Sequence, residues 1–276
     1  MSRCAISYLT LRFIFGMILL VIACGVSHAA IDISPAYVQV ALDRGRPSGE
    51  FVLSNTGDTE ERYRIRSASY KFSETGELQR LPSDENSLAS WIIFNPKELT
   101  IAPKTKRIVR FVIATHGNVR PGEYWAAMEL ESLNVRTTIL KPKSETSLNL
   151  QISSSILVPI YAQSGKITCS GGPSNAKVFP SSKGPVIQCT FTNSGNGRIQ
   201  VSGEYDILDA GGKIVLTGPF CHASALPGST RLLTRLAADP LPDGKYKVKI
   251  RFNTPQLGQT PVQEADFEWK APAPSN

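Results

Sequence analysis

Few residues of this chain are of the types that perform chemistry, and those few are spread along it. The chain has three histidines and five cysteines among 276 residues. Beyond the first thirty residues the histidines are His116 and His222, and both lie in polar segments typical of loops, which leaves acid–base catalysis with few candidates. Glu204 and Asp206 alternate with Tyr205, a pattern that in a strand directs both carboxylates to solvent rather than into a catalytic pair.

The motifs of the common enzyme classes are missing from the sequence. It has no GxSxG elbow, no HExxH, no P-loop and no GxGxxG after an expected strand. No CxxC or Cys/His spacing of the kind that holds a metal occurs either. We therefore expect a protein that is not an enzyme, with no catalytic residues, no metal site and no cofactor.

The first thirty residues predict export. Arg3 and Arg12 flank polar residues, and an apolar run too short to span a bilayer follows from Phe13 to Ala23. Small residues then precede an expected cleavage after Ala29 or Ala30, so residues 1–29 are predicted to be a signal peptide.

An alternative reading of the same segment is a lipoprotein signal. Val21-Ile22-Ala23-Cys24 resembles a bacterial lipobox, in which Cys24 is lipidated and becomes the first residue after processing. In both cases the protein leaves the cytoplasm. The predicted location is the periplasm, with the outer membrane or the cell surface as the alternative.

Export favours disulfide formation, and three cysteines remain after the leader: Cys169, Cys189 and Cys221. They allow one disulfide and one free thiol, and which pair forms stays open. Cys189 lies on the apolar parity of its expected strand, which favours an inward thiol with Cys169 as its partner.

The rest of the chain has the pattern of β-sandwiches. Short alternating or apolar segments are separated by turn clusters at intervals of about ten residues. The length beyond the leader fits two domains. Lysine and arginine are mixed with acidic residues rather than gathered in blocks, although the net charge is +7, so we expect no nucleic-acid partner.

A change in composition predicts the boundary between the domains. After Tyr161 the sequence becomes rich in serine, glycine and proline, with a short linker at 163–165. We expect one domain over residues 31–162, a second over 166–270 and a flexible tail over 271–276. The motif FVLSNTGD at 51–58 resembles CTFTNSGN at 189–196, which predicts two sandwiches of related topology.

Ser147 to Tyr161, SLNLQISSSILVPIY, is the longest uncharged segment expected to be a strand. Apolar residues of one parity alternate with polar ones in its first half, which predicts an extended strand that could reach roughly 50 Å. A strand of that length either spans a large sheet or leaves part of its edge free to pair with another chain.

Arginines alternate with apolar residues in an earlier expected strand. Arg62, Arg64 and Arg66 share the parity opposite to Tyr63 and Ile65. We interpret the three arginines first as a solvated sheet face and second as an anion-binding stripe.

Several of these segments together carry a resemblance to a known family. They are IDISPAYVQVAL, FVLSNTGD, LTIAPKTKRIVRFVI, GEYWAAMEL and LNLQISSSILVPIY. With them, residues 31–162 resemble the periplasmic pilus-assembly chaperones, the PapD-like family of two immunoglobulin-like domains in an L shape, and the second half resembles a generic sandwich. The resemblance implies an all-β fold of two immunoglobulin-like β-sandwich domains in tandem.

The resemblance also implies a function. In that family the last strand of the first domain supplies the missing strand of an incomplete subunit. The residues that would contact the partner here are Leu148, Leu150, Ile152 and Ile156. The implied partners are a secreted or pilus-like subunit and an outer-membrane usher, and the membrane itself becomes a partner if Cys24 is lipidated. The rival hypothesis is a structural or adhesive surface protein that keeps the fold without chaperone activity.

The chain departs from the family at its anion anchor. The family holds the subunit's C-terminal carboxylate with an arginine on the first strand and a lysine near the end of the long strand. The matching positions here are Tyr37 and Val158 or Pro159, which carry no charge. The candidates for anion contacts elsewhere in the first half are Arg64, Arg66 and Arg110.

Overall fold

The computed structural model describes residues 31–43, 45–82, 85–115, 117–134, 136–140, 148–152, 154–239 and 241–270. For 136–140 and 148–152 it describes the backbone alone. The expected leader with Cys24, His116 and the expected tail lie outside the described residues. No helix within the described ranges is long and apolar enough to cross a membrane.

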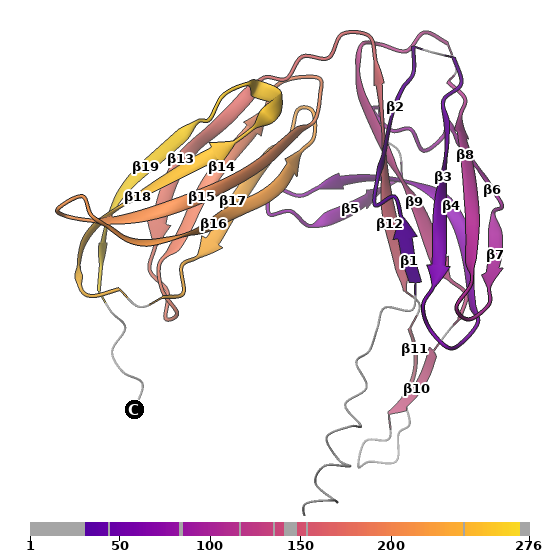
Figure 1. Ribbon diagram of the computed structural model, residues 1–276, viewed down its shortest axis with the longest axis horizontal. Coiled ribbons are helices and arrows are strands. Elements are labelled where there is room, and N and C mark those ends of the chain that lie inside the picture. The colour runs from indigo at the N-terminus through magenta and orange to yellow at the C-terminus, as the bar shows by residue number, and fades with distance from the viewer. Residues whose placement is uncertain are drawn as a thin grey trace, which may run out of the picture.

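The first half folds into two facing sheets (Figure 1). The first sheet has the order β1-β3-β8-β6, with strands Ile31–Ser34, Ser48–Asn55, Lys106–Ile113 and Ile92–Asn95. The second has the order β2-β12-β9-β4-β5, and β7 also pairs with β4. Its strands, in that order and ending with β7, are Val38–Ala41, Ser155–Ser164, Gly122–Ser132, Glu61–Phe72, Leu78–Leu81 and Glu98–Ile101.

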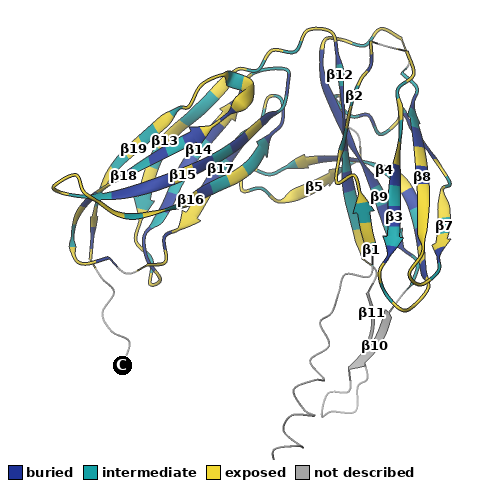
Figure 2. Ribbon diagram, viewed as in Figure 1, coloured by how far each residue is buried: buried dark blue, intermediate teal, exposed yellow. Residues whose placement is uncertain are grey.

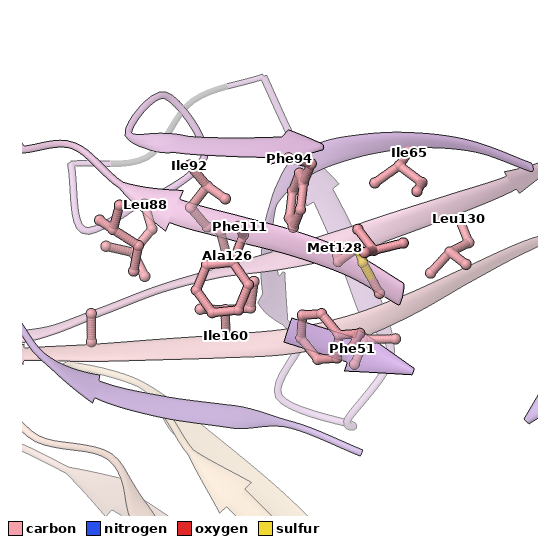
Figure 3. Packing of buried hydrophobic residues seen from close by; sticks show 14 of the residues in the cluster. Phe51, Ile65, Leu88, Ile92, Phe94, Phe111, Ala126, Met128, Leu130 and Ile160 are labelled. Carbon is pink, nitrogen blue, oxygen red and sulfur yellow. The ribbon is translucent and has the colours of Figure 1, made fainter. Parts of the chain in front are cut away.

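The core between these sheets follows from the period-two pattern of the strands. Tyr63 and Ile65 are buried in β4, while Arg62 and Arg66 beside them are exposed, as alternation requires. Figure 3 shows the centre of this core, where side chains from both sheets meet. The fully buried side chains there include Phe51, Met128, Leu130 and Ile160.

The long strand expected from Ser147 to Tyr161 is two strands in the structure. β11 spans Leu148–Ile152 and forms a two-stranded hairpin with β10, Arg136–Leu140, which projects from one end of the sandwich (Figure 1). β12 pairs with β9 from Ser155↔Glu131 onward, whereas the hairpin begins at Arg136↔Ile152. The two sides of this ladder therefore have unequal numbers of residues between the pairings, so one continuous register is impossible.

The second half forms a second sandwich. One sheet has the order β13-β14-β17, with strands Gly171–Phe179, Val186–Asn193 and Thr230–Leu236. The other has the order β16-β15-β18-β19, with strands Ile214–Ala225, Ile199–Asp209, Gly244–Asn253 and Val262–Trp269. A short 3-10 helix, Pro255–Leu257, follows β18. The strands β5, β10 and β13 lie where the sequence pattern predicted none.

In both sandwiches the buried residues run along the strand faces that meet inside, and exposed residues cover the outside (Figure 2). Ile187, Cys189 and Phe191 are fully buried, so the predicted inward face of β14 is confirmed. The predicted fold class, all-β with two immunoglobulin-like β-sandwiches in tandem, is also confirmed.

The predicted likeness between the two turn motifs appears as matching hydrogen bonds. Asn55 and Asn193 are both buried, and each side-chain oxygen accepts the N–H two residues on, from Gly57 and Gly195, at 2.9 Å. Each amide donates to the carbonyl four residues on and to one distant strand end. Equivalent asparagines therefore close the same kind of turn in both sandwiches.

Candidate functional site

The first element of the site is a strand edge paired on one side. β12 pairs with β9 along its whole length, but β2 joins its other side only from Ile160↔Val38 onward. β11 pairs with β10, and β10 follows β9 in the chain, so β10 and β9 flank β11 and β12 on the same side. Among the described strands, Leu148–Ile152 of β11 and Ser155–Pro159 of β12 therefore each have one side without a partner. Unpaired backbone N–H and C=O groups on such an edge are a template for another strand.

The four predicted partner-binding residues fall on this edge. Leu148, Leu150 and Ile152 lie in β11, opposite Leu140, Thr138 and Arg136 of β10, respectively. Their side chains lie outside the description. Ile156, in β12, is half-buried and packs against the core of its own sandwich.

The predicted anion contacts of the first half lie elsewhere. Arg64 pairs with Glu98 at 2.7 Å, Arg66 pairs with Glu131, and Arg110 lies 3.5 Å from Glu50. The side chains of the three arginines are 42%, 52% and 71% exposed. The hydrogen bond to Glu98 raises the pKa of Arg64. The three arginines therefore pair with carboxylates on exposed sheet faces, as our first interpretation predicted for Arg64 and Arg66.

The second element of the site is the junction of the two sandwiches, which contains a buried ion pair. The side chain of Glu123, at the start of β9, is 1% exposed, and that of Arg198, just before β15, is 9% exposed. Their Oε1 and Nε atoms lie 3.9 Å apart, and Glu123 also accepts the backbone N–H of Arg198. The N–H of Glu123 donates to the carbonyl of Asn196 at 2.8 Å. The guanidinium of Arg198 lies 3.6 Å from the ring centroid of Tyr161.

The β4–β5 hairpin makes a second bridge, because it extends from the first sandwich toward the second (Figure 1). The N–H of Leu232 donates to the carbonyl of Glu74 at 2.7 Å. The guanidinium of Arg231 lies 5.0 Å from the ring centroid of Phe72. Leu226 packs with buried residues of the first sandwich: Tyr70, Trp125, Ala127 and Tyr161. Burial is the main cause that raises the pKa of Tyr70, and the neighbouring Tyr161 raises it further.

Between the two bridges lies a pocket of about 380 Å³. The first sandwich contributes aromatic walls, including Tyr37, Phe72 and Tyr161. The second contributes Arg198, Arg231 and other polar residues. No aspartate or glutamate of the described chain lines it.

Arg198 and Arg231 are the residues that sequence reasoning missed. Arg198 directly precedes β15 and Arg231 is the second residue of β17, and neither belongs to the alternating pattern of Arg62, Arg64 and Arg66. The sequence gives no sign that two residues so placed meet Tyr37 and Phe72 across a domain junction. Both arginines of the pocket therefore belong to the second sandwich.

The predicted disulfide is not formed. Cys169, Cys189 and Cys221 are free thiols in the described chain. The thiol of Cys189 faces the core and donates to the carbonyl of Ser174 at 3.2 Å, while the thiol of Cys169 lies against the carbonyl of Arg198 at 4.0 Å. Burial raises the pKa of Cys189 to about 11 and that of Cys221 to about 12. No group of His, Cys, Asp and Glu residues able to hold a metal occurs in the described ranges.

No family model and no curated protein matches the chain. Solved structures do. The YadV chaperone has 15% sequence identity and a TM-score of 0.46, over 87% of this chain and 100% of that one. A complex of the chaperone CsuC with the tip adhesion subunit CsuE, from Csu pili of Acinetobacter baumannii, has 14% identity and a TM-score of 0.47, over 86% and 98%. The CupB2 chaperone of Pseudomonas aeruginosa has 10% identity and a TM-score of 0.45, over 84% and 98%. The similar structures also include the class 5 fimbriae chaperone CfaA and the periplasmic chaperone SfaE, and the likeness is one of fold.

Proposed function

We propose that this protein is an exported, non-enzymatic chaperone that binds a secreted or fimbrial subunit by β-strand addition along the edge from Leu148 to Pro159. The observation that carries the proposal is the one-sided pairing of this edge: β10 and β9 occupy one side, and β2 reaches the other side only at Ile160. The working unit consists of the two sandwiches, 31–162 and 166–270, after removal of residues 1–29.

Strand addition divides the work between backbone and side chains. Main-chain hydrogen bonds to the open edge supply affinity for any extended segment. Leu148, Leu150 and Ile152 supply specificity, because residues of one parity enter the pockets of the acceptor. An incomplete subunit gains a strand in this way and is kept from aggregating through its own open edge.

The test is co-expression of the exported chain with the secreted subunits encoded beside it, followed by purification of the complex. The expected product is a soluble one-to-one complex. Leu150→Asp should reduce its affinity at least about 100-fold, because the acceptor pocket would bury an unpaired carboxylate at a cost of several kcal/mol. Asn149→Asp is the matched control, since it adds the same charge on the opposite parity and should leave binding nearly unchanged.

A second variant tests which side of β11 the partner uses. Ile139 and Asn149 lie directly opposite in the β10–β11 hairpin, so a disulfide between Ile139→Cys and Asn149→Cys would lock the two strands together. If the subunit adds to the open side, the locked protein still binds it. Loss of binding on oxidation, with recovery on reduction, would mean that the partner displaces β10 and would contradict the edge that we propose.

Equal binding by wild type and Leu150→Asp would refute the proposal as a whole. The rival function, a structural or adhesive surface protein, rests on the lipobox-like sequence at Cys24. It predicts lipid labelling that Cys24→Ser abolishes and no subunit complex, whereas a chaperone released by cleavage after Ala29 or Ala30 acts in the periplasm.

A further inference from the structure

The open edge consists of two segments that meet at a break. Leu148–Ile152 of β11 pairs with β10, and Ser155–Pro159 of β12 pairs with β9. The carbonyl of Ser154, between them, accepts the N–H of Ser132 at 2.9 Å. Because β2 joins the other side of β12 only at Ile160, a ladder on one side alone holds the start of β12. Strand ends held in this way open easily unless side chains fix them.

Three side chains from three strands fix the start of β12. Ser155 is its first residue, Glu129 lies in β9 and Arg80 lies in β5. The Nη2 atom of Arg80 lies 2.6 Å from the Oε1 atom of Glu129, and it also donates to the hydroxyl of Ser155. That hydroxyl donates to the same Oε1 atom at 3.1 Å. We call these three residues the edge clamp. The side chain of its glutamate is only 13% exposed.

Arg80 reaches the edge from the far side of the sheet. In the order β2-β12-β9-β4-β5, two strands separate β5 from β12, and Arg80 lies opposite Tyr70 of β4. The second sandwich holds the tip of the β4–β5 hairpin, because the carbonyl of Glu74 accepts the N–H of Leu232 at 2.7 Å. A two-stranded hairpin is marginally stable by itself, so this contact steadies the strand from which Arg80 extends.

We propose that Arg80 is a positioning residue for strand addition, which fixes Ser155 at the break so that β11 and β12 present one continuous template. The inference rests on the proposed function. One extended segment can pair with both Leu148–Ile152 and Ser155–Pro159 only if the two are aligned. A template that is already ordered binds at a lower entropic cost than one that becomes ordered on binding. The side chain of Arg80 is 54% exposed, and exposed ion pairs add little stability, so its effect should appear in binding rather than in folding.

Hydrogen exchange of the full chain after leader removal, measured by mass spectrometry without a partner, tests the clamp itself. Arg80→Gln should raise the exchange rates at the start of β12 and at Ser132 at least about fivefold. Arg66→Gln is the matched control and should change them less than twofold. Arg66 has a 52% exposed side chain and pairs with Glu131 of β9, and this ion pair involves no residue of β12. Strands β14 and β18 should exchange as in wild type in both variants.

The secreted subunit captured by co-expression is the probe for binding. Arg80→Gln should raise its dissociation constant at least about tenfold, and Arg66→Gln less than twofold. The midpoint of thermal unfolding should fall equally little in both variants.

Leu150 supplies a measurement that a merely structural role of Arg80 would not change. The strands of the two residues, β11 and β5, do not pair, so their effects on binding should add if Arg80 only supports packing. If Arg80 aligns the two segments, Leu150→Asp should weaken binding at least about threefold less in the Arg80→Gln background than in wild type.

Three results would overturn the inference. They are unchanged exchange at the start of β12 in Arg80→Gln, equal effects of Arg80→Gln and Arg66→Gln on binding, and strictly additive effects of Arg80→Gln and Leu150→Asp. Ser155→Ala removes another member of the clamp and should reproduce the faster exchange, so it decides the matter even if Arg80→Gln does not fold. If wild type captures no subunit, the proposed function fails, and the exchange rates still decide whether Arg80 fixes the edge. If wild type and Arg80→Gln bind the subunit equally, only this inference fails.

Discussion

A substitution of Glu123, the negative partner of Arg198, tests the junction of the two sandwiches most directly. Glu123→Gln keeps the size of the side chain and an oxygen that can still accept the backbone N–H of Arg198. It removes the charge that faces the guanidinium. Because both side chains are almost fully buried, water cannot replace that charge without opening the junction.

The expected loss of stability in Glu123→Gln depends on the contacts that Arg198 and the substituted glutamine keep. Removing one member of a buried ion pair costs about 3–5 kcal/mol, because the other charge stays buried and uncompensated. Arg198 keeps its contact with the ring of Tyr161 at 3.6 Å, and a desolvated cation–π contact contributes about 2 kcal/mol in either protein. The substituted amide also keeps one hydrogen bond, so we expect a loss of about 3 kcal/mol in the free energy of unfolding, at the lower end of the range.

Urea denaturation followed by tryptophan fluorescence measures this loss, since Trp125 lies in the first sandwich and Trp269 in the second and both are buried. The double variant Glu123→Gln/Arg198→Met should cost less than the sum of the single variants by at least about 1 kcal/mol. Because the pair joins the two sandwiches, the single variants should also separate the unfolding of one from that of the other. A loss below about 1 kcal/mol, or strictly additive variants, would refute a buried pair that couples the domains.

Two further predictions concern the second sandwich. Arg251 donates to Asp206, and this hydrogen bond is the largest cause of the lowered pKa of the Asp206 carboxyl. The ionised carboxylate therefore stabilises the folded protein above about pH 4. This stabilisation is lost as the pH falls through the folded-state pKa of Asp206. Asp206→Asn should cost about 1–3 kcal/mol at pH 7, and a difference from wild type that does not shrink in acid would contradict this assignment. In the folded protein at pH 8, iodoacetamide should label half-buried Cys169 before Cys189 and Cys221, whose pKa values of about 11 and about 12 leave little thiolate. Peptide mass spectrometry that finds Cys189 joined to Cys169 would show that the disulfide forms after all.

Local patterns were sufficient for much of the fold. Alternation placed Tyr63, Ile65, Cys189 and Phe191 inside their sandwiches, because a strand with one buried face has a period of two. The likeness of two short turn motifs predicted related sandwiches, and Asn55 and Asn193 show why: a buried asparagine can close this turn with its own amide and carbonyl. These features depend on neighbours within a few residues, which a sequence displays directly.

The features that sequence reasoning missed depend on distant partners. The apolar parity from Leu148 to Ile160 is interrupted only at Ser154, and it did not show that the pairing partner changes from β9 to β10, so it did not predict the break into β11 and β12. The disulfide expected between Cys169 and Cys189 required a geometry across the sheet that strand parity does not contain. Nothing in the sequence distinguished Arg198 and Arg231 from other arginines, because their contacts with Tyr37 and Phe72 exist only across the junction of the two sandwiches.

The two sandwiches contribute different parts of the pocket at their junction. In this chain the aromatic walls belong to the first sandwich and both arginines to the second. Two bridges keep them in register: the ion pair at Glu123 and the backbone hydrogen bond from Leu232 to Glu74. Pro159, where the open side of β12 ends, also lines this pocket, so the angle between the sandwiches sets the distance from the two arginines to that end of the edge. If the protein binds a subunit at this edge as we propose, we expect that binding to be coupled to the arrangement of the domains.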